Sequence, residues 1–127
     1  MRHFSAFILS FCSLFVTAQQ SLPFDFETTP TTADFLDFAG GVATVMANPD
    51  PSGINESAMV AQIVRNPGDV WAGSKIILSD YLDLQTIGGF KMKVWVPLAN
   101  TVVKLKLEGL GVADLDAITT VTGAWET

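Results

Sequence analysis

The sequence predicts an antiparallel all-β fold, either a sandwich or a barrel. Short runs in which apolar and polar residues alternate recur along the chain, whereas the spacing of an amphipathic helix is almost absent. Gly, Pro, Asn and Asp separate the runs, and these residues favour turns between strands. The chain has 127 residues, which is enough for about one such domain.

Residues 1–18 have the layout of a secretory signal peptide. They begin with Arg2, continue through an apolar stretch from Phe4 to Val16, and end in the small-residue pattern Val16-x-Ala18. The apolar stretch is short for a bilayer span, although a retained N-terminal anchor is the alternative. We therefore expect an exported protein, secreted or at the cell surface, that has no membrane association after cleavage.

Signal cleavage would remove the only cysteine, Cys12, and the only histidine, His3. A mature domain without thiol or imidazole excludes disulfides, Ser-His-Asp and Cys-His catalysis, and zinc sites built from these ligands. Loss of Arg2 would reduce the seven Lys and Arg residues to six, against thirteen Asp and Glu. Such an acidic domain is a poor partner for nucleic acid.

The first half of the mature chain contains four predicted strands. In Leu22–Glu27 two phenylalanines alternate with two acids, and the next candidates are Phe35–Phe38 and Val42–Ala47. A loop with two prolines and a glycine, "ANPDPSGINES", separates these from Ala58–Val64.

The second half begins with the compact turn "RNPGD", which precedes the predicted strand Lys75–Leu78. Phe90–Val96 and Val102–Glu108 then alternate around a turn at Pro97–Thr101, and we interpret "GVADLDA" as a loop. A weaker strand spans Ile118–Val121. The final "TGAWET" has the pattern of a turn and a new strand beginning at Trp125, so we expect the domain, 19–127, to be C-terminally incomplete and to continue beyond residue 127.

Much of the core should come from the apolar positions of these alternating runs. The expected core residues are Val60, Ile63, Ile77, Phe90, Met92, Val94, Val96, Val103, Leu105 and Leu107.

Five segments in this order resemble one kind of module: "LPFDFET", "DFAGGVATVMANPDPSG", "MVAQIVRNPGDVWAGSKIIL", "GGFKMKVWVPLANTVVKLKLEG" and "AWET". Together they cover nearly all of residues 22–127 and are similar to the N-terminal β-sandwich modules of secreted bacterial polysaccharide-degrading enzymes. Those modules are similar to galactose-binding-like jelly rolls and to carbohydrate-binding modules of the family 4/9 type. The resemblance implies a jelly-roll sandwich that holds a polysaccharide or oligosaccharide, beside a catalytic domain, such as a glycoside hydrolase, elsewhere in the chain. The alternative is a structural sandwich that packs against a neighbouring domain and binds no small ligand.

Sugar binding needs flat aromatic faces beside polar groups, which directs attention to the tryptophans. Trp95 lies on the face of its predicted strand that otherwise carries lysines, so it is the first candidate for a sugar platform. Trp71, in "DVWAGS", is the second. The expected polar fringe includes Lys93, Lys104 and Glu108, together with Lys91 and Lys106. The alternative for both tryptophans is packing under a loop or at the rim of the core.

The domain should require no cofactor, but related sandwiches carry a structural calcium ion near the first strand. Asp25 and Glu27, on one face of the predicted first strand, are the candidate ligands, although this pattern equally suits a solvent-facing strand. A glycosidase needs two carboxylates facing each other across a cleft. Because most of the acids fall in predicted loops with no distinctive setting, we expect no catalysis within this segment.

Overall fold

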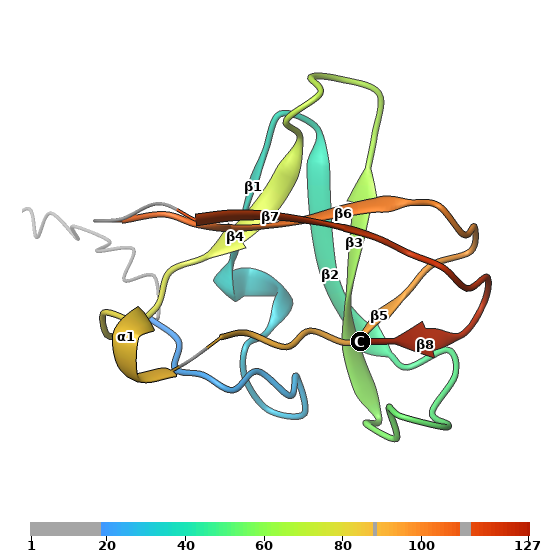
Figure 1. Ribbon diagram of the computed structural model, residues 1–127, viewed down its shortest axis with the longest axis horizontal. Helices are drawn as coiled ribbons and strands as arrows, with labels where there is room; N and C mark the ends of the chain where they lie inside the picture. The colour runs from blue at the N-terminus through green and yellow to red at the C-terminus, as the bar shows by residue number, and fades with distance from the viewer. Residues whose placement is uncertain (1–18, 88, 110–112) are drawn as a thin grey trace, which may run out of the picture.

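The computed structural model describes residues 19–87, 89–109 and 113–127, and this part of the chain is all-β (Figure 1). The strands are β1 (Phe35–Phe38), β2 (Gly41–Ala47), β3 (Met59–Arg65), β4 (Gly73–Ile76), β5 (Val94–Trp95), β6 (Val102–Leu107), β7 (Ala113–Ile118) and β8 (Trp125–Glu126). Helical structure in the described chain is limited to a 3-10 turn, η1 (Thr32–Asp34), and the short helix α1 (Leu84–Ile87). The predicted signal peptide, residues 1–18, lies outside the described residues.

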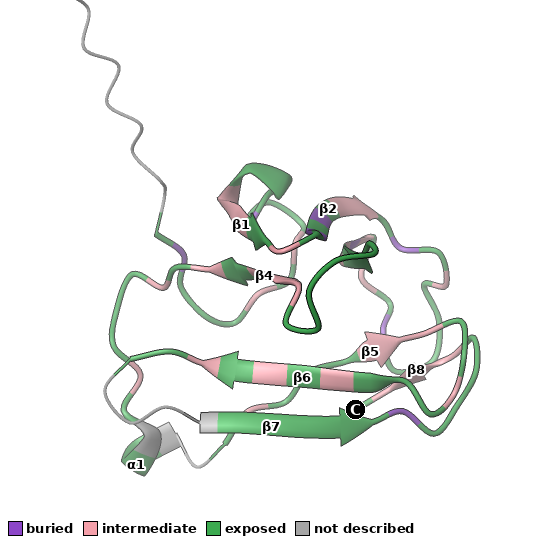
Figure 2. Cartoon of the chain, turned by 90° about the horizontal axis from the view of Figure 1, so that it is seen from above, coloured by how far each residue is buried: buried purple, intermediate pink, exposed green. Residues whose placement is uncertain are grey.

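The strands pair as antiparallel two-stranded ribbons, β1–β4, β2–β3, β5–β8 and β6–β7. The β1–β4 and β2–β3 ribbons stand side by side, and the β6–β7 ribbon runs across them (Figure 1). Viewed from above, β6 and β7 lie in a different layer from β1, β2 and β4 (Figure 2). The all-β prediction is therefore confirmed, although each sheet formed by the described residues has only two strands.

Most of the predicted strands appear at or close to their expected positions. The β1 strand has the predicted bounds, and the ends of β2, β3 and β6 differ from the prediction by no more than one residue. The β4 strand begins two residues earlier than expected because Gly73 pairs with Phe38. The alternating pattern and the turn residues thus locate these elements well.

The predicted strand Leu22–Glu27 is wrong, because these residues form no strand. The backbone N–H of Glu27 donates a 3.0 Å hydrogen bond to Oδ1 of Asp25, which closes a tight local turn. Phe26, between them, has a φ of 62°, which is incompatible with an extended strand. The Phe90–Val96 prediction is also too long, since only Val94 and Trp95 pair, opposite the two residues of β8.

The segment interpreted as the loop "GVADLDA" contributes instead to β7, which ends at Ile118, where a strand was expected to begin. The loop interpretation is wrong, because Asp116 pairs with Lys104 in the ladder with β6. Lys104 Nζ lies 2.9 Å from Oδ1 of Asp116, so the acid faces an opposite charge across the ribbon. Residues 110–112, at the start of the predicted loop, lie outside the described chain.

The core is small, and nearly all large apolar residues of the described chain are half-buried or exposed (Figure 2). Among apolar residues in the described chain, Ala43 and Val60 are buried, and Pro30 is the largest side chain that is fully enclosed. The predicted core residues Phe90, Val94, Val96, Val103, Leu105 and Leu107 are half-buried. The prediction is wrong for Ile63, Ile77 and Met92, which are exposed. A two-stranded ribbon leaves part of its apolar face uncovered, which explains this outcome.

Candidate functional site

Trp71 is the most exposed of the three tryptophans and lies in the loop between β3 and β4. Its indole stacks on the ring of Phe38, with centroids 6.2 Å apart and an angle of 14° between the planes. The Trp71 side chain is nevertheless 63% exposed. We call this pair, Trp71 and Phe38, the aromatic platform.

Two glycines determine where the platform lies. Gly73 is opposite Phe38 in the β1–β4 register, and a Cβ on Gly73 would lie 3.0 Å from Cζ of Phe38. The phenyl ring therefore lies directly over the backbone of β4. Gly41 is closer still to that backbone, since a Cβ there would lie 2.2 Å from the carbonyl oxygen of Gly73. Glycine at both positions permits β1, β2 and β4 to approach closely enough to support the platform.

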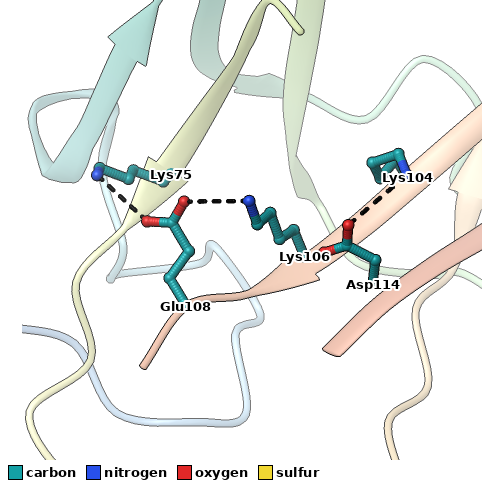
Figure 3. Close-up of polar contacts among 5 residues, drawn as sticks. All are labelled: Lys75, Lys104, Lys106, Glu108 and Asp114. Carbon is teal, nitrogen blue, oxygen red and sulfur yellow. Dashed lines mark hydrogen bonds and ion pairs between the residues drawn. The ribbon is translucent and has the colours of Figure 1, made fainter. Parts of the chain in front are cut away.

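Charged groups lie on the face of the β1–β4 ribbon that carries Phe38. Lys75 is two residues beyond Gly73 in β4, so its side chain points to the same side of the ribbon as Phe38. Its Nζ lies 3.4 Å from Oε2 of Glu108, whose Oε1 lies 3.9 Å from Nζ of Lys106 (Figure 3). This Lys75–Glu108–Lys106 network is exposed and links β4 to the end of β6. The predicted fringe residue Glu108 is thus connected to the ribbon that carries Phe38.

Lys106 is in the same network, whereas no ion pair among the described residues joins Lys91, Lys93 or Lys104 to it. Lys104 faces Asp116 and Asp114 of β7, at 2.9 and 4.0 Å (Figure 3 draws the Asp114 contact). The hydrogen bond with Asp116, aided by the charges of both acids, raises the pKa of Lys104 above its ordinary value. Lys93 is exposed and precedes β5. Sequence reasoning grouped these lysines because they share an alternating pattern, but β5 pairs with β8 and β6 with β7.

Trp95, the first candidate from sequence, lies in a more enclosed setting than Trp71. It is half-buried in β5 opposite Trp125, and its Cζ2 would lie 3.9 Å from a Cβ on Gly123. Its indole N–H is buried and has no hydrogen-bond partner among the described residues. The Nε1 of Trp125, by contrast, donates a 2.7 Å hydrogen bond to the carbonyl of Asp50. These contacts favour a packing role for the pair.

The two candidate calcium ligands have separate contacts. Asp25 accepts the backbone hydrogen bond that forms the turn before Glu27. Oε1 of Glu27 accepts hydrogen bonds from the backbone N–H groups of Ala58, at 2.7 Å, and Met59, at 3.3 Å. Glu27 therefore ties the N-terminal segment to the start of β3. The described chain contains no cluster of three or more His, Cys, Asp or Glu side chains arranged to hold a metal ion.

No protein-family model matches the chain, and neither the curated proteins nor the solved structures include a match. The helical segments of the described residues include none long and apolar enough to cross a membrane.

Sequence reasoning missed Phe38 and Lys75 as members of the candidate site. Phe38 was assigned to a strand, but its partner Gly73 is far away in the sequence. Local alternation identifies a strand and does not identify which strand it pairs with. The one local signal was the glycine two residues after Trp71, because a strand glycine often marks the close approach of another group.

Proposed function

We propose that residues 19–127 belong to a non-catalytic carbohydrate-binding module of jelly-roll sandwich type in an exported protein, with the aromatic platform as its sugar-binding surface. The observation that carries this proposal is the exposed indole of Trp71 supported from beneath by Phe38. An aromatic ring held in a fixed orientation presents an apolar face on which the C–H groups of a pyranose pack. Support by Phe38 reduces the conformational entropy that Trp71 loses when a sugar binds.

The Lys75–Glu108–Lys106 network supports the same proposal. Lys75 lies on the face of the β1–β4 ribbon that carries Phe38, and its ion pair with Glu108 brings Lys106 and Glu108 to that ribbon. These groups supply hydrogen-bond donors and acceptors, and sugar hydroxyls match both. The formal net charge of the whole chain is −6, which disfavours polyanionic glycans. The proposed ligand is therefore a neutral polysaccharide or oligosaccharide.

The test is affinity electrophoresis of the exported protein through gels that contain soluble neutral polysaccharides. Trp71→Ala should abolish the retardation, while the melting temperature changes little because the ring is mostly exposed. Val70→Ala is the matched control, since Val70 is a neighbouring residue that is 88% exposed. Trp95→Ala should retain binding but lower stability by about 3 kcal/mol, as expected for truncating a packed aromatic ring.

Two results would contradict the proposal. If no polysaccharide in the panel retards the wild-type protein, the carbohydrate-binding function is wrong. If Trp95→Ala abolishes retardation at full stability while Trp71→Ala does not, the function stands and the platform is the wrong surface.

A structural module that packs against a neighbouring domain is the second candidate. It is supported by Val102 and Ile118, which pair across the β6–β7 ribbon on one face and are 60% and 63% exposed. Because the mature chain should lack cysteine, Ile118→Cys can report whether this surface is covered in the exported protein. Slow modification by a thiol reagent, relative to Lys93→Cys, would favour this candidate, and equal rates would argue against it.

A further inference from the structure

A second concave surface lies between the N-terminal segment and the β2–β3 ribbon. It is an open depression of about 430 Å³, at the small end of the range for ligand sites. Its apolar lining consists of Phe26, Pro30, Ala33, Val45 and Met59, and its polar lining consists of Glu27, Thr28, Thr31 and Thr32. We call it the threonine pocket. The platform residues do not line it, so it is a separate surface.

The floor of the threonine pocket is firmly held. Pro30 is fully buried. Met59 pairs with Ala47, which is two residues after Val45 in β2, so Val45 and Met59 lie on the same face of the β2–β3 ribbon. The ring of Phe26 stacks on Phe35, with centroids 6.3 Å apart and 19° between the planes. The apolar part of the pocket is therefore preorganised.

The polar groups of the pocket are held in place by the backbone. Oγ of Thr32 accepts a 2.8 Å hydrogen bond from the N–H of Val45, which leaves its hydroxyl proton for a ligand. Oε1 of Glu27 accepts hydrogen bonds from the backbone N–H groups of Ala58 and Met59. The other carboxylate oxygen, Oε2, accepts no hydrogen bond within the described chain, and Thr28 makes no side-chain hydrogen bond there. Thr28, Thr32 and Glu27 thus bring hydroxyl donors and a carboxylate acceptor to the lining of a pocket that also has an apolar part.

We propose that the threonine pocket binds one neutral, polyhydroxylated unit, such as a single hexose or pentose. Each ligand hydroxyl donates one hydrogen bond and accepts others, so adjacent hydroxyls match the carboxylate of Glu27 and the hydroxyls of Thr28 and Thr32 together. The C–H groups of the ring pack on Val45 and Met59. Glu27 repels anionic ligands, and an amine ligand gains only one charged contact from it.

The test is a titration of the ¹⁵N-labelled exported protein with the methyl glycosides of glucose, galactose, mannose and xylose, followed by amide chemical shifts. Saturable shifts should appear at Thr28, Thr32, Val45 and Met59 for at least one glycoside, with a dissociation constant of about millimolar. Thr28→Val removes a hydroxyl without changing the shape of the side chain and should weaken binding roughly two- to tenfold. Glu27→Gln keeps an acceptor for the two backbone amides and should weaken binding by about tenfold or more.

Matched controls separate this inference from folding and from the aromatic platform. Thr44→Val makes the same chemical change on the opposite face of β2 and should leave the affinity unchanged. Trp71→Ala should also leave it unchanged, so this inference and the proposed function can fail separately. The inference is wrong if no glycoside gives saturable shifts at these amides up to about 100 mM. It is also wrong if Thr28→Val binds as tightly as Thr44→Val.

Discussion

Replacing Gly41 with alanine should disrupt the part of the fold that supports the aromatic platform. A Cβ at this position would lie 2.2 Å from the carbonyl oxygen, 2.5 Å from the carbonyl carbon and 2.6 Å from the Cα of Gly73. All three atoms belong to the backbone of β4, so no side chain can rotate to relieve the contact. The β2 strand must separate from β4 to admit one methyl group.

The expected cost follows from the nature of that obstacle. Adding a methyl group to a well-packed site costs about 1–3 kcal/mol when the surroundings yield. Here the obstacle is backbone, so we expect the upper end, about 3 kcal/mol. For a domain of about 100 residues, each kcal/mol lowers the melting temperature by roughly 4 °C or more, so the decrease should be at least about 10 °C.

The measurement is thermal and urea unfolding of the protein, followed by circular dichroism and tryptophan fluorescence. Thr44→Ala is the control, because Thr44 is exposed on the same strand and its truncation should change stability by less than about 0.5 kcal/mol. A Gly41→Ala protein that melts within about 2 °C of the wild type would refute the packing argument. It would mean that β2 and β4 are not in this close contact.

Two further predictions concern the C-terminal strand. Trp125→Phe keeps an aromatic ring but loses the 2.7 Å hydrogen bond to the Asp50 carbonyl. The free energy of unfolding in urea should fall by about 1 kcal/mol, and amide exchange in the loop that contains Asp50 should become faster. Unchanged stability would contradict this prediction. Hydrogen bonds from the backbone and side chain of Thr120 hold the pKa of Glu126 below its ordinary value. Its stabilising contribution is therefore present above the unfolded-state pKa and is lost as the pH falls through the folded-state pKa. Unfolding measured from pH 6 to pH 3 should show a smaller acid-dependent loss for Glu126→Gln, and equal losses would contradict this.

The sequence predicts strand positions well and strand partners poorly, for a physical reason. Alternation and turn residues act within a few positions, and they locate β1, β2, β3 and β6 to within a residue. Pairing depends on contacts between segments far apart in the chain, such as Phe38 with Gly73. This is why the alternating pattern groups Trp95 with Lys104 although the two residues belong to different ribbons.

The errors at β7 and at the N-terminal segment arise from acids whose role depends on their partners. Asp116 serves a strand because Lys104 lies across from it, whereas Asp25 closes a turn by accepting the N–H of Glu27. The same side chain stabilises either structure, and local sequence does not distinguish them. Of the predicted site residues, Trp71 and Glu108 were identifiable from sequence, but Phe38 and Lys75 required the β1–β4 register.

The platform and the packing of the ribbons depend on each other, and this dependence connects the two candidate functions. Phe38 is held over Gly73, and the backbone of Gly73 is held by the approach of Gly41. A partner domain that covers the open apolar surface would stabilise the ribbons and thereby fix Trp71 in its stacked orientation. A packing role and a sugar-binding role are therefore compatible in one protein. In that case Gly41→Ala, which separates the strands, should abolish both the protection of Ile118→Cys from the thiol reagent and the retardation of the protein by polysaccharide. Trp71→Ala should abolish the retardation and leave Ile118→Cys protected.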